Sequence, residues 1–238
     1  MRMPHKKMSV LVMLLLGSYS YTSWGAGFGI NATRIIYHEQ DPSVQITMRN
    51  TTVDKTYLVR AAVVGDSGQG VKDFVVLPPL FRLDAGHDGN VRVVYQPLTP
   101  LPKDRESVFY FKALAIPNTN PLTREGRIMS GQVKMAVGNQ IKLFYRPNGI
   151  TDPVKGVFQT LEFSRVPAGI KVKNPTPYNV TFATLLVDGK PVSMEKTRTM
   201  IAPFSSYTYL SGSRVKKMAK WAVINDLGGV DTYSGVIR

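Results

Sequence analysis

The stretch that decides the fold class is Gly131–Pro147, which reads GQVKMAVGNQIKLFYRP. Aliphatic side chains stand at every second position, Val133, Met135 and Val137, and Lys142 is placed inside the apolar run IKLF. A period of two is typical of a β-strand with one apolar face. The alternation leaves open whether this face meets another molecule or only the protein's own core. A charge inside such a strand makes chemical sense if another molecule completes its environment.

The same strand signal recurs on both sides of this stretch. Runs rich in Val, Ile, Tyr and Phe predict strands at Ile30–Tyr37, Val44–Asn50, Tyr57–Val64, Phe74–Leu77, Asn90–Tyr95, Val108–Ile116 and Gly131–Tyr145. A second, smaller set is predicted at Leu161–Phe163, Gly169–Lys173, Asn179–Leu186, Ser206–Leu210, Lys220–Ile224 and Val230–Ile237. Short strands separated by turn segments at this spacing favour antiparallel sandwiches of the immunoglobulin type. The sequence therefore predicts an all-β protein, with one helical turn as an option at Val215–Trp221.

The chain is predicted to contain a leader and two domains. Residues 1–25 combine three basic residues, a short apolar core and a small-residue cleavage region, which is the layout of a secretory signal peptide. The turn-rich segment RPNGITDP, Arg146–Pro153, is the natural boundary between a domain at 26–147 and a domain at 148–238. The apolar part of the leader is too short to span a bilayer. We therefore expect an exported protein without stable membrane insertion.

Composition excludes several kinds of site. The chain contains no cysteine, so it has neither a disulfide framework nor a thiolate metal site. The formal net charge is +14, but the basic residues are scattered among strand-like segments, which argues against a nucleic-acid surface. Only three histidines are present, the carboxylates are dispersed, and no nucleophile, metal or phosphate-binding motif occurs. We expect no enzyme activity, no metal and no cofactor.

Seven local motifs carry a resemblance to a known family. They are ATRIIY (Ala32–Tyr37), LPPLFRLDAG (Leu77–Gly86), RESVFYFKALAIP (Arg105–Pro117), IKLFYRP (Ile141–Pro147), VKNPTPYNVTF (Val172–Phe182), APFSS (Ala202–Ser206) and INDLGG (Ile224–Gly229). In this order they resemble the periplasmic chaperones of the chaperone–usher pathway, the PapD-like family, which assemble adhesive pili. The resemblance implies two immunoglobulin-like sandwiches in a boomerang arrangement with a cleft between them.

The resemblance also implies roles for individual residues. Arg34 and Lys142 match the basic pair that holds the C-terminal carboxylate of a pilus subunit, and the alternative is that each pairs with an acidic neighbour of its own chain. Val133, Met135 and Val137 match the donor strand that completes the subunit's fold. Glu106, Arg146 and Asp226 match a charge network that bridges the two domains, and the alternative is three independent surface charges. The sequence leaves open whether the bond before Pro78 or Pro79 is cis.

The chain departs from the family pattern in two places. HEQDPS, His38–Ser43, stands where relatives usually carry a proline–alanine–glycine turn, so the loop beside the cleft is expected to differ. No cysteines flank the connection from Pro117 to Val133, which favours the subclass with a short loop before the donor strand.

The resulting hypothesis is a periplasmic, non-enzymatic chaperone of pilus subunits. It would bind each subunit by donor-strand complementation and deliver it to an outer-membrane usher, and the free form could self-associate to cover its strand. An exported sandwich that binds a sugar or a host protein, such as a lectin or adhesin, is the alternative. A pilus subunit fits poorly, because pilins typically have one domain and an N-terminal extension.

Overall fold

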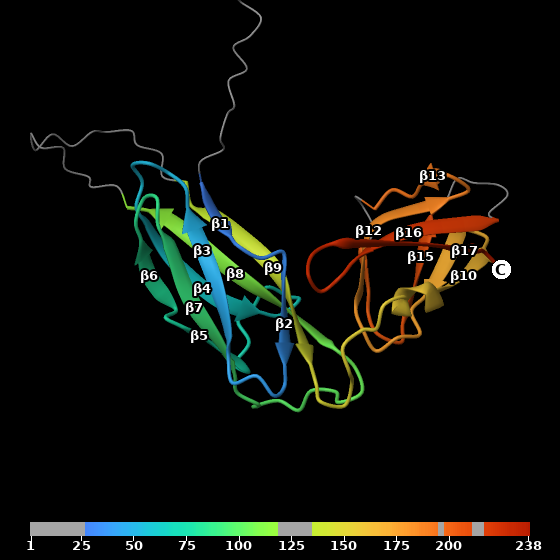
Figure 1. Cartoon of the computed structure of the whole chain (residues 1–238), viewed down its shortest axis with the longest axis horizontal. Helices are drawn as coiled ribbons and strands as arrows, with labels where there is room; N and C mark the ends of the chain where they lie inside the picture. The colour runs from blue at the N-terminus through green and yellow to red at the C-terminus, as the bar shows by residue number, and fades with distance from the viewer. Residues whose placement is uncertain (1–26, 119–134, 195–197, 211–216) are drawn as a thin grey trace, which may run out of the picture.

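Strand pairing divides the described chain into two β-sandwiches that meet at an angle (Figure 1). The computed structural model describes residues 27–118, 135–194, 198–210 and 217–238. The predicted all-β fold with two immunoglobulin-like sandwiches is therefore confirmed. In Figure 1 the turn that follows β16 (Met218–Ile224) reaches from the second sandwich towards the first.

The first sandwich packs a four-stranded sheet on a five-stranded sheet. The four-stranded sheet contains, in spatial order, β1 (Phe28–Ile30), β3 (Val44–Asn50), β7 (Asp88–Tyr95) and β5 (Phe74–Leu77). The five-stranded sheet contains β2 (Arg34–His38), β9 (Val137–Arg146), β8 (Ser107–Pro117), β4 (Tyr57–Val64) and β6 (Leu80–Leu83). All of these pairs are antiparallel except β2 with β9, which run parallel.

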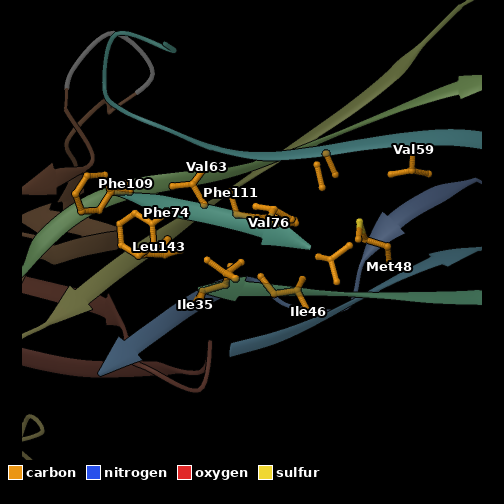
Figure 2. Close-up of a cluster of buried hydrophobic side chains, with 14 of the residues drawn as sticks. Ile35, Ile46, Met48, Val59, Val63, Phe74, Val76, Phe109, Phe111 and Leu143 are labelled. Atoms are coloured by element: carbon orange, nitrogen blue, oxygen red, sulfur yellow. The ribbon is translucent and has the colours of Figure 1, made fainter. Parts of the chain in front are cut away.

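The core of this sandwich is filled from both sheets. Phe74 and Val76 come from β5 of one sheet, and Phe111 and Leu143 come from β8 and β9 of the other; Figure 2 shows these side chains gathered in one cluster. Alternate residues of each strand face inward, because successive side chains of a strand point to opposite faces. Burying aliphatic and aromatic side chains in this way contributes about 1.5–3 kcal/mol each. The C-terminal part of β9 is held in place by this packed core.

The second sandwich has its own core around Trp221. One sheet contains β10 (Glu162–Val166), β11 (Gly169–Lys173) and β15 (Ser206–Leu210). The other contains β13 (Lys190–Pro191), β12 (Val180–Val187), β16 (Met218–Ile224) and β17 (Val230–Val236), and β14 (Met200–Ile201) also pairs with β12. A short 3-10 helix, η1 (Val157–Thr160), precedes β10. No helix among the described residues has the length and apolar character needed to cross a membrane.

Several predicted strands differ from the observed ones. The strand expected at Ile30–Tyr37 is interrupted: β1 pairs with β3 in one sheet, and β2 pairs with β9 in the other. The helical turn considered at Val215–Trp221 is wrong where the structure describes it, because Met218 onwards belongs to β16. The strand expected from Gly131 begins at Val137, and the preceding Met135 and Ala136 lie outside the strand. The Leu77–Pro78 bond is cis.

Candidate functional site

One face of β9 passes from buried to open along the strand. Leu143 and Tyr145 lie in the core, with exposed fractions of 0% and 3%. Val137 is on the same face and is 40% exposed, and Met135 just before the strand is 75% exposed. The protein's own core therefore does not account for the apolar character of Met135 and Val137. Val133, the third predicted donor residue, lies outside the described residues.

The backbone of β9 is also open along part of one edge. β8 pairs with residues 137–145 on one side. On the other side, β2 pairs only with residues 142–146. Among the described strands, nothing pairs with this second edge from Val137 to Ile141. Unpaired strand edges offer a row of backbone donors and acceptors to another chain.

Arg34 and Lys142 stand side by side where this open edge ends. They are direct register partners in the parallel pair of β2 and β9, so their side chains project to the same face of the sheet. Nη1 of Arg34 donates to the carbonyl of Ile224 at 2.8 Å, and Nζ of Lys142 lies 3.4 Å from Oγ1 of Thr181. The guanidinium also lies 5.7 Å from the ring centroid of Phe144. Both cations thus face the second sandwich.

Neither cation has a carboxylate partner among the described residues. None of the ion pairs within 4 Å involves Arg34 or Lys142. Nε of Arg34 is buried and has no hydrogen-bond partner in the described part of the chain. Burial lowers the pKa of Lys142, and the adjacent charge of Arg34 lowers it further. Burial also lowers the pKa of Arg34, although Asp226 and Glu106 oppose this. Two partly desolvated cations that form no ion pair with a described residue make a site suited to an anion.

The two cations line a cavity between the sandwiches. Its volume is about 370 Å³, and it is lined by Thr33, Arg34, Tyr110, Gln140, Ile141, Lys142, Thr181, Ala183, Ile224, Gly228 and Val230. The first six of these residues belong to the first sandwich and the other five to the second. The cavity is therefore an interdomain cleft that begins at the open edge of β9. Its polar groups suit a small charged end group better than an extended apolar ligand.

A buried charge network joins the two sandwiches beside this cleft. Arg146, 2% exposed, donates from Nη2 to Oε1 of Glu106 at 2.6 Å and from Nη1 to Oδ2 of Asp226 at 2.9 Å. Burial alone would lower the pKa of Arg146, but its hydrogen bonds to Asp226 and Glu106 raise it above the usual range. The structure thus brings Glu106, Arg146 and Asp226 into one network across the boundary. Such a network connects the two sandwiches through buried contacts.

Sequence reasoning missed three further members of this network. The other carboxylate oxygen of Glu106 accepts from the backbone N–H of Asn179 at 2.8 Å. Asp152 accepts from Nη1 of Arg146 at 2.5 Å, and the Tyr178 ring centroid lies 5.5 Å from the guanidinium. Asn179 and Tyr178 lie within VKNPTPYNVTF, so that motif was the available signal. No sequence pattern marked Asp152, which is 68% exposed.

Gly228 sets how closely the sandwiches approach at the cleft. It has φ of +81°, and a Cβ there would clash with Oγ1 of Thr33. We expect Gly228→Ala to lower thermal stability and to widen the cleft. Gly189→Ala is the matched control, because Gly189 has φ of +77° but no atom within 4 Å of the added Cβ. Backbone strain of about 1–2 kcal/mol is common to both, so the difference measures the contact.

The measurement is the thermal midpoint of both variants and of the pair Gly228→Ala with Thr33→Ala. Removing the Thr33 hydroxyl should restore part of the stability lost at Gly228 and none of that lost at Gly189. Equal losses in the two glycine variants would show that the contact with Thr33 has no role.

No group of three or more His, Cys, Asp or Glu side chains in the described ranges is placed to hold a metal ion. The site described above consists of a strand edge, apolar side chains and two cations.

Comparison with family models identifies both sandwiches. Residues 27–151 match the model described as pili and flagellar-assembly chaperone, PapD N-terminal domain. Residues 156–235 match the model described as pili assembly chaperone PapD, C-terminal domain.

Individual proteins agree with the family models. The probable fimbrial chaperone protein ElfD of Escherichia coli (strain K12) is 32% identical over 221 residues, which cover 92% of this chain and 91% of ElfD. The crystal structure of the E. coli chaperone DraB superposes with a TM-score of 0.74 at 31% identity, covering 90% of this chain and 97% of that one. A chain in the structure of Salmonella enterica SafA pilin in complex with the SafB chaperone gives a TM-score of 0.77 at 27% identity, covering 90% and 98%. This protein belongs to the PapD-like family of pili assembly chaperones.

Proposed function

We propose that this protein binds pilus subunits by supplying β9 as a strand that the subunit lacks, and that Arg34 and Lys142 hold the subunit's C-terminal carboxylate. The observation that carries this proposal is the open edge of β9, which runs from the exposed Met135 and Val137 directly to two cations without a counterion. An open strand edge with exposed apolar side chains and a pair of unpaired cations are both unfavourable in an isolated protein. A single bound subunit would pair with the edge and supply the anion.

The first part of the proposal is strand addition. A subunit whose own sandwich lacks a strand exposes an apolar groove between two unpaired edges. The segment from Val133 to Ile141 would supply backbone hydrogen bonds to these edges, and Val133, Met135 and Val137 would fill the groove. A register slip of one residue would turn this apolar face away from the groove, so the register must be set.

The second part is the carboxylate anchor that sets this register. Arg34 offers several N–H donors in one plane, including the unpartnered Nε, and Lys142 adds a compact charge. A chain terminus bound here would place the preceding residues beside the open edge of β9. Because the cleft is partly closed by the second sandwich, the charge-assisted hydrogen bonds would be stronger than on an open surface.

Family membership supports the finer parts of this function. SafA pilin in complex with the SafB chaperone is a relative's structure with a pilus subunit as partner, which supports the same class of partner here. We propose a periplasmic location after cleavage of residues 1–25, transfer of subunits to an outer-membrane usher, and no enzyme activity. Self-association of the free form through the open β9 edge is part of the same proposal.

Two structural predictions also remain proposals. The predicted division into 26–147 and 148–238 is supported by the separate cores of the two sandwiches and by family models that end at residue 151 and resume at residue 156. The short-loop subclass depends on the connection before β9, most of which lies outside the described residues. The lectin or adhesin alternative has no observation in its favour, whereas family membership supports a chaperone.

The test is a pull-down from periplasmic extract with tagged protein, in which the partner is identified by mass. The expected partner is a pilus subunit with an intact C-terminus. Val137→Asp should weaken its binding by at least about tenfold, because a charge would have to enter the apolar groove. Val53→Asp is the control, since Val53 is 93% exposed in the loop between β3 and β4 and belongs to neither β9 nor the cleft. A partner of another class, or equal capture by both variants, would contradict the proposal.

A further inference from the structure

Met135 is a thioether, and it is the more exposed of the two proposed donor residues that the structure describes. Of the methionines that the structure describes, Met135 is 75% exposed, Met218 is 45% exposed and Met48 is fully buried. Met194 and Met200 are partly buried. Oxidant access therefore differs widely among these sulfur atoms, and it is greatest at a residue whose apolar character the proposed function needs.

In this chain, methionine is the sulfur-containing residue that an oxidant can attack. The chain has ten methionines and no cysteine, so no thiolate competes for a sulfur-directed oxidant. Oxidation turns a flexible apolar side chain into a polar sulfoxide, and sulfoxide reductases reverse the change. A sulfoxide at an exposed position is hydrated and tolerated, whereas one that must enter an apolar groove is not.

We propose that Met135 is an oxidation site through which peroxides reversibly switch off subunit binding, an inference that rests on the proposed function of β9. In the reaction the Met135 sulfur attacks one oxygen of a peroxide, an S–O bond forms and the O–O bond breaks. The sulfur loses two electrons, and with hydrogen peroxide the other product is water. The fold is unaffected, because the side chain contributes little to the protein's own core.

The open edge of β9 explains why the switch acts on binding alone. The side chain of Val137 stays apolar, and the backbone edge from Val137 to Ile141 and the cations Arg34 and Lys142 are unchanged by peroxide. The sulfoxide at Met135 would be carried into the subunit's groove without a hydrogen-bond partner. Losing the burial of one such side chain corresponds to about a ten- to hundred-fold weaker complex.

The experiment treats the purified chaperone with a graded series of hydrogen peroxide and removes the peroxide with catalase. Peptide masses then give the oxidised fraction of each methionine. Affinity for the subunit recovered in the pull-down is measured before and after treatment. We expect Met135 to oxidise ahead of Met218 and far ahead of Met48, with at least about a tenfold loss of affinity. Methionine sulfoxide reductase should restore binding.

Two variants separate Met135 from the other sulfur atoms, each compared with its own untreated state. Met135→Leu should keep its starting affinity after peroxide, because leucine is apolar and has no sulfur. Met218→Leu should lose affinity on treatment as the wild type does. Circular dichroism before and after treatment checks that the fold persists.

The outcomes distinguish this inference from the function on which it rests. If the untreated wild type fails to bind the subunit, both the proposed function and the switch are wrong. If binding survives full oxidation of Met135, or if Met135→Leu loses affinity as strongly as the wild type, the switch alone is wrong. Oxidation of Met218 before Met135 would equally contradict it.

Discussion

Replacing Lys142 by alanine is expected to weaken subunit binding by about 2–5 kcal/mol, which corresponds to roughly 30-fold to several-thousand-fold in affinity. The loss is large because the subunit's carboxylate would be left in a partly desolvated cleft with one cation instead of two. The free chaperone should be at least as stable as wild type, since Lys142 forms no ion pair within the described residues and its burial disfavours the charged form. The substitution is therefore expected to lower the affinity for the subunit without lowering the stability of the free protein.

Lys171→Ala is the control, because Lys171 is exposed on the small sheet formed by β10, β11 and β15. Affinity of the purified subunit is the measurement, with thermal unfolding of each free variant beside it. Arg34 is the less suitable position, since its side chain also bonds Ile224 across the cleft. Undiminished binding by Lys142→Ala would refute the anchor.

The protonation of Lys142 gives an independent check on the same anchor. Desolvation holds its folded-state pKa below the usual value of 10.5. As the pH rises through this lowered pKa, Lys142 loses its proton while exposed lysines keep theirs. Subunit affinity should then fall, and the free fold should gain stability, because above the folded pKa the unfolded chain binds more protons. Neither change should occur in Lys142→Ala.

Replacing Arg146 by alanine is expected to cost about 3–5 kcal/mol of unfolding free energy. The change leaves Glu106, whose side chain is 3% exposed, as a buried carboxylate with only Asn179 to stabilise it. Burial already raises the pKa of Glu106 against the opposing effects of Arg146 and Asn179. Because the guanidinium also binds Asp226, the variant loses a connection between the sandwiches as well.

Asp152→Asn is the matched control, since Asp152 touches the same guanidinium but is 68% exposed. Exposed ion pairs contribute about 0–1 kcal/mol, so this variant should unfold near the wild-type midpoint. Denaturant unfolding measures both variants. The double variant Glu106→Ala with Arg146→Ala should cost less than the sum of the single changes, because neither buried charge is then left alone. Comparable losses for Arg146→Ala and Asp152→Asn would show that burial of the network is unimportant.

The strands could be predicted well from the sequence because each sheet buries only one of its faces, and this produces alternating apolar and polar residues. Val44–Asn50, Tyr57–Val64 and Phe74–Leu77 were predicted with the observed bounds, since alternation and turn residues both mark them. The change of sheet between β1 and β2 leaves no such mark, because the residues on both sides are equally strand-like. β6 was missed because Leu80–Leu83 directly follows two prolines, which indicate a turn.

Single residues of the site were harder to predict than strands. Arg34 and Lys142 were singled out through motifs, but only the three-dimensional structure shows that neither forms an ion pair within the described residues. Asp152 and Thr181 meet the site from the second sandwich through contacts between residues distant in sequence. The exposure of Met135 likewise depends on where the opposite sheet ends, which alternation does not indicate.

The parallel pairing of β2 with β9 has a consequence for which chains the cleft accepts. β2 occupies one side of β9 from Lys142 to Arg146, and the vacant part from Val137 to Ile141 continues the same line. An incoming strand whose carboxyl group meets Arg34 must therefore run in the same direction as β2 and stop where β2 begins. A chain that continued past this point would collide with β2. If the proposed anchor is right, the cleft would recognise the position of a chain end, and it would reject a subunit extended beyond its natural C-terminus or an internal segment of an unfolded protein.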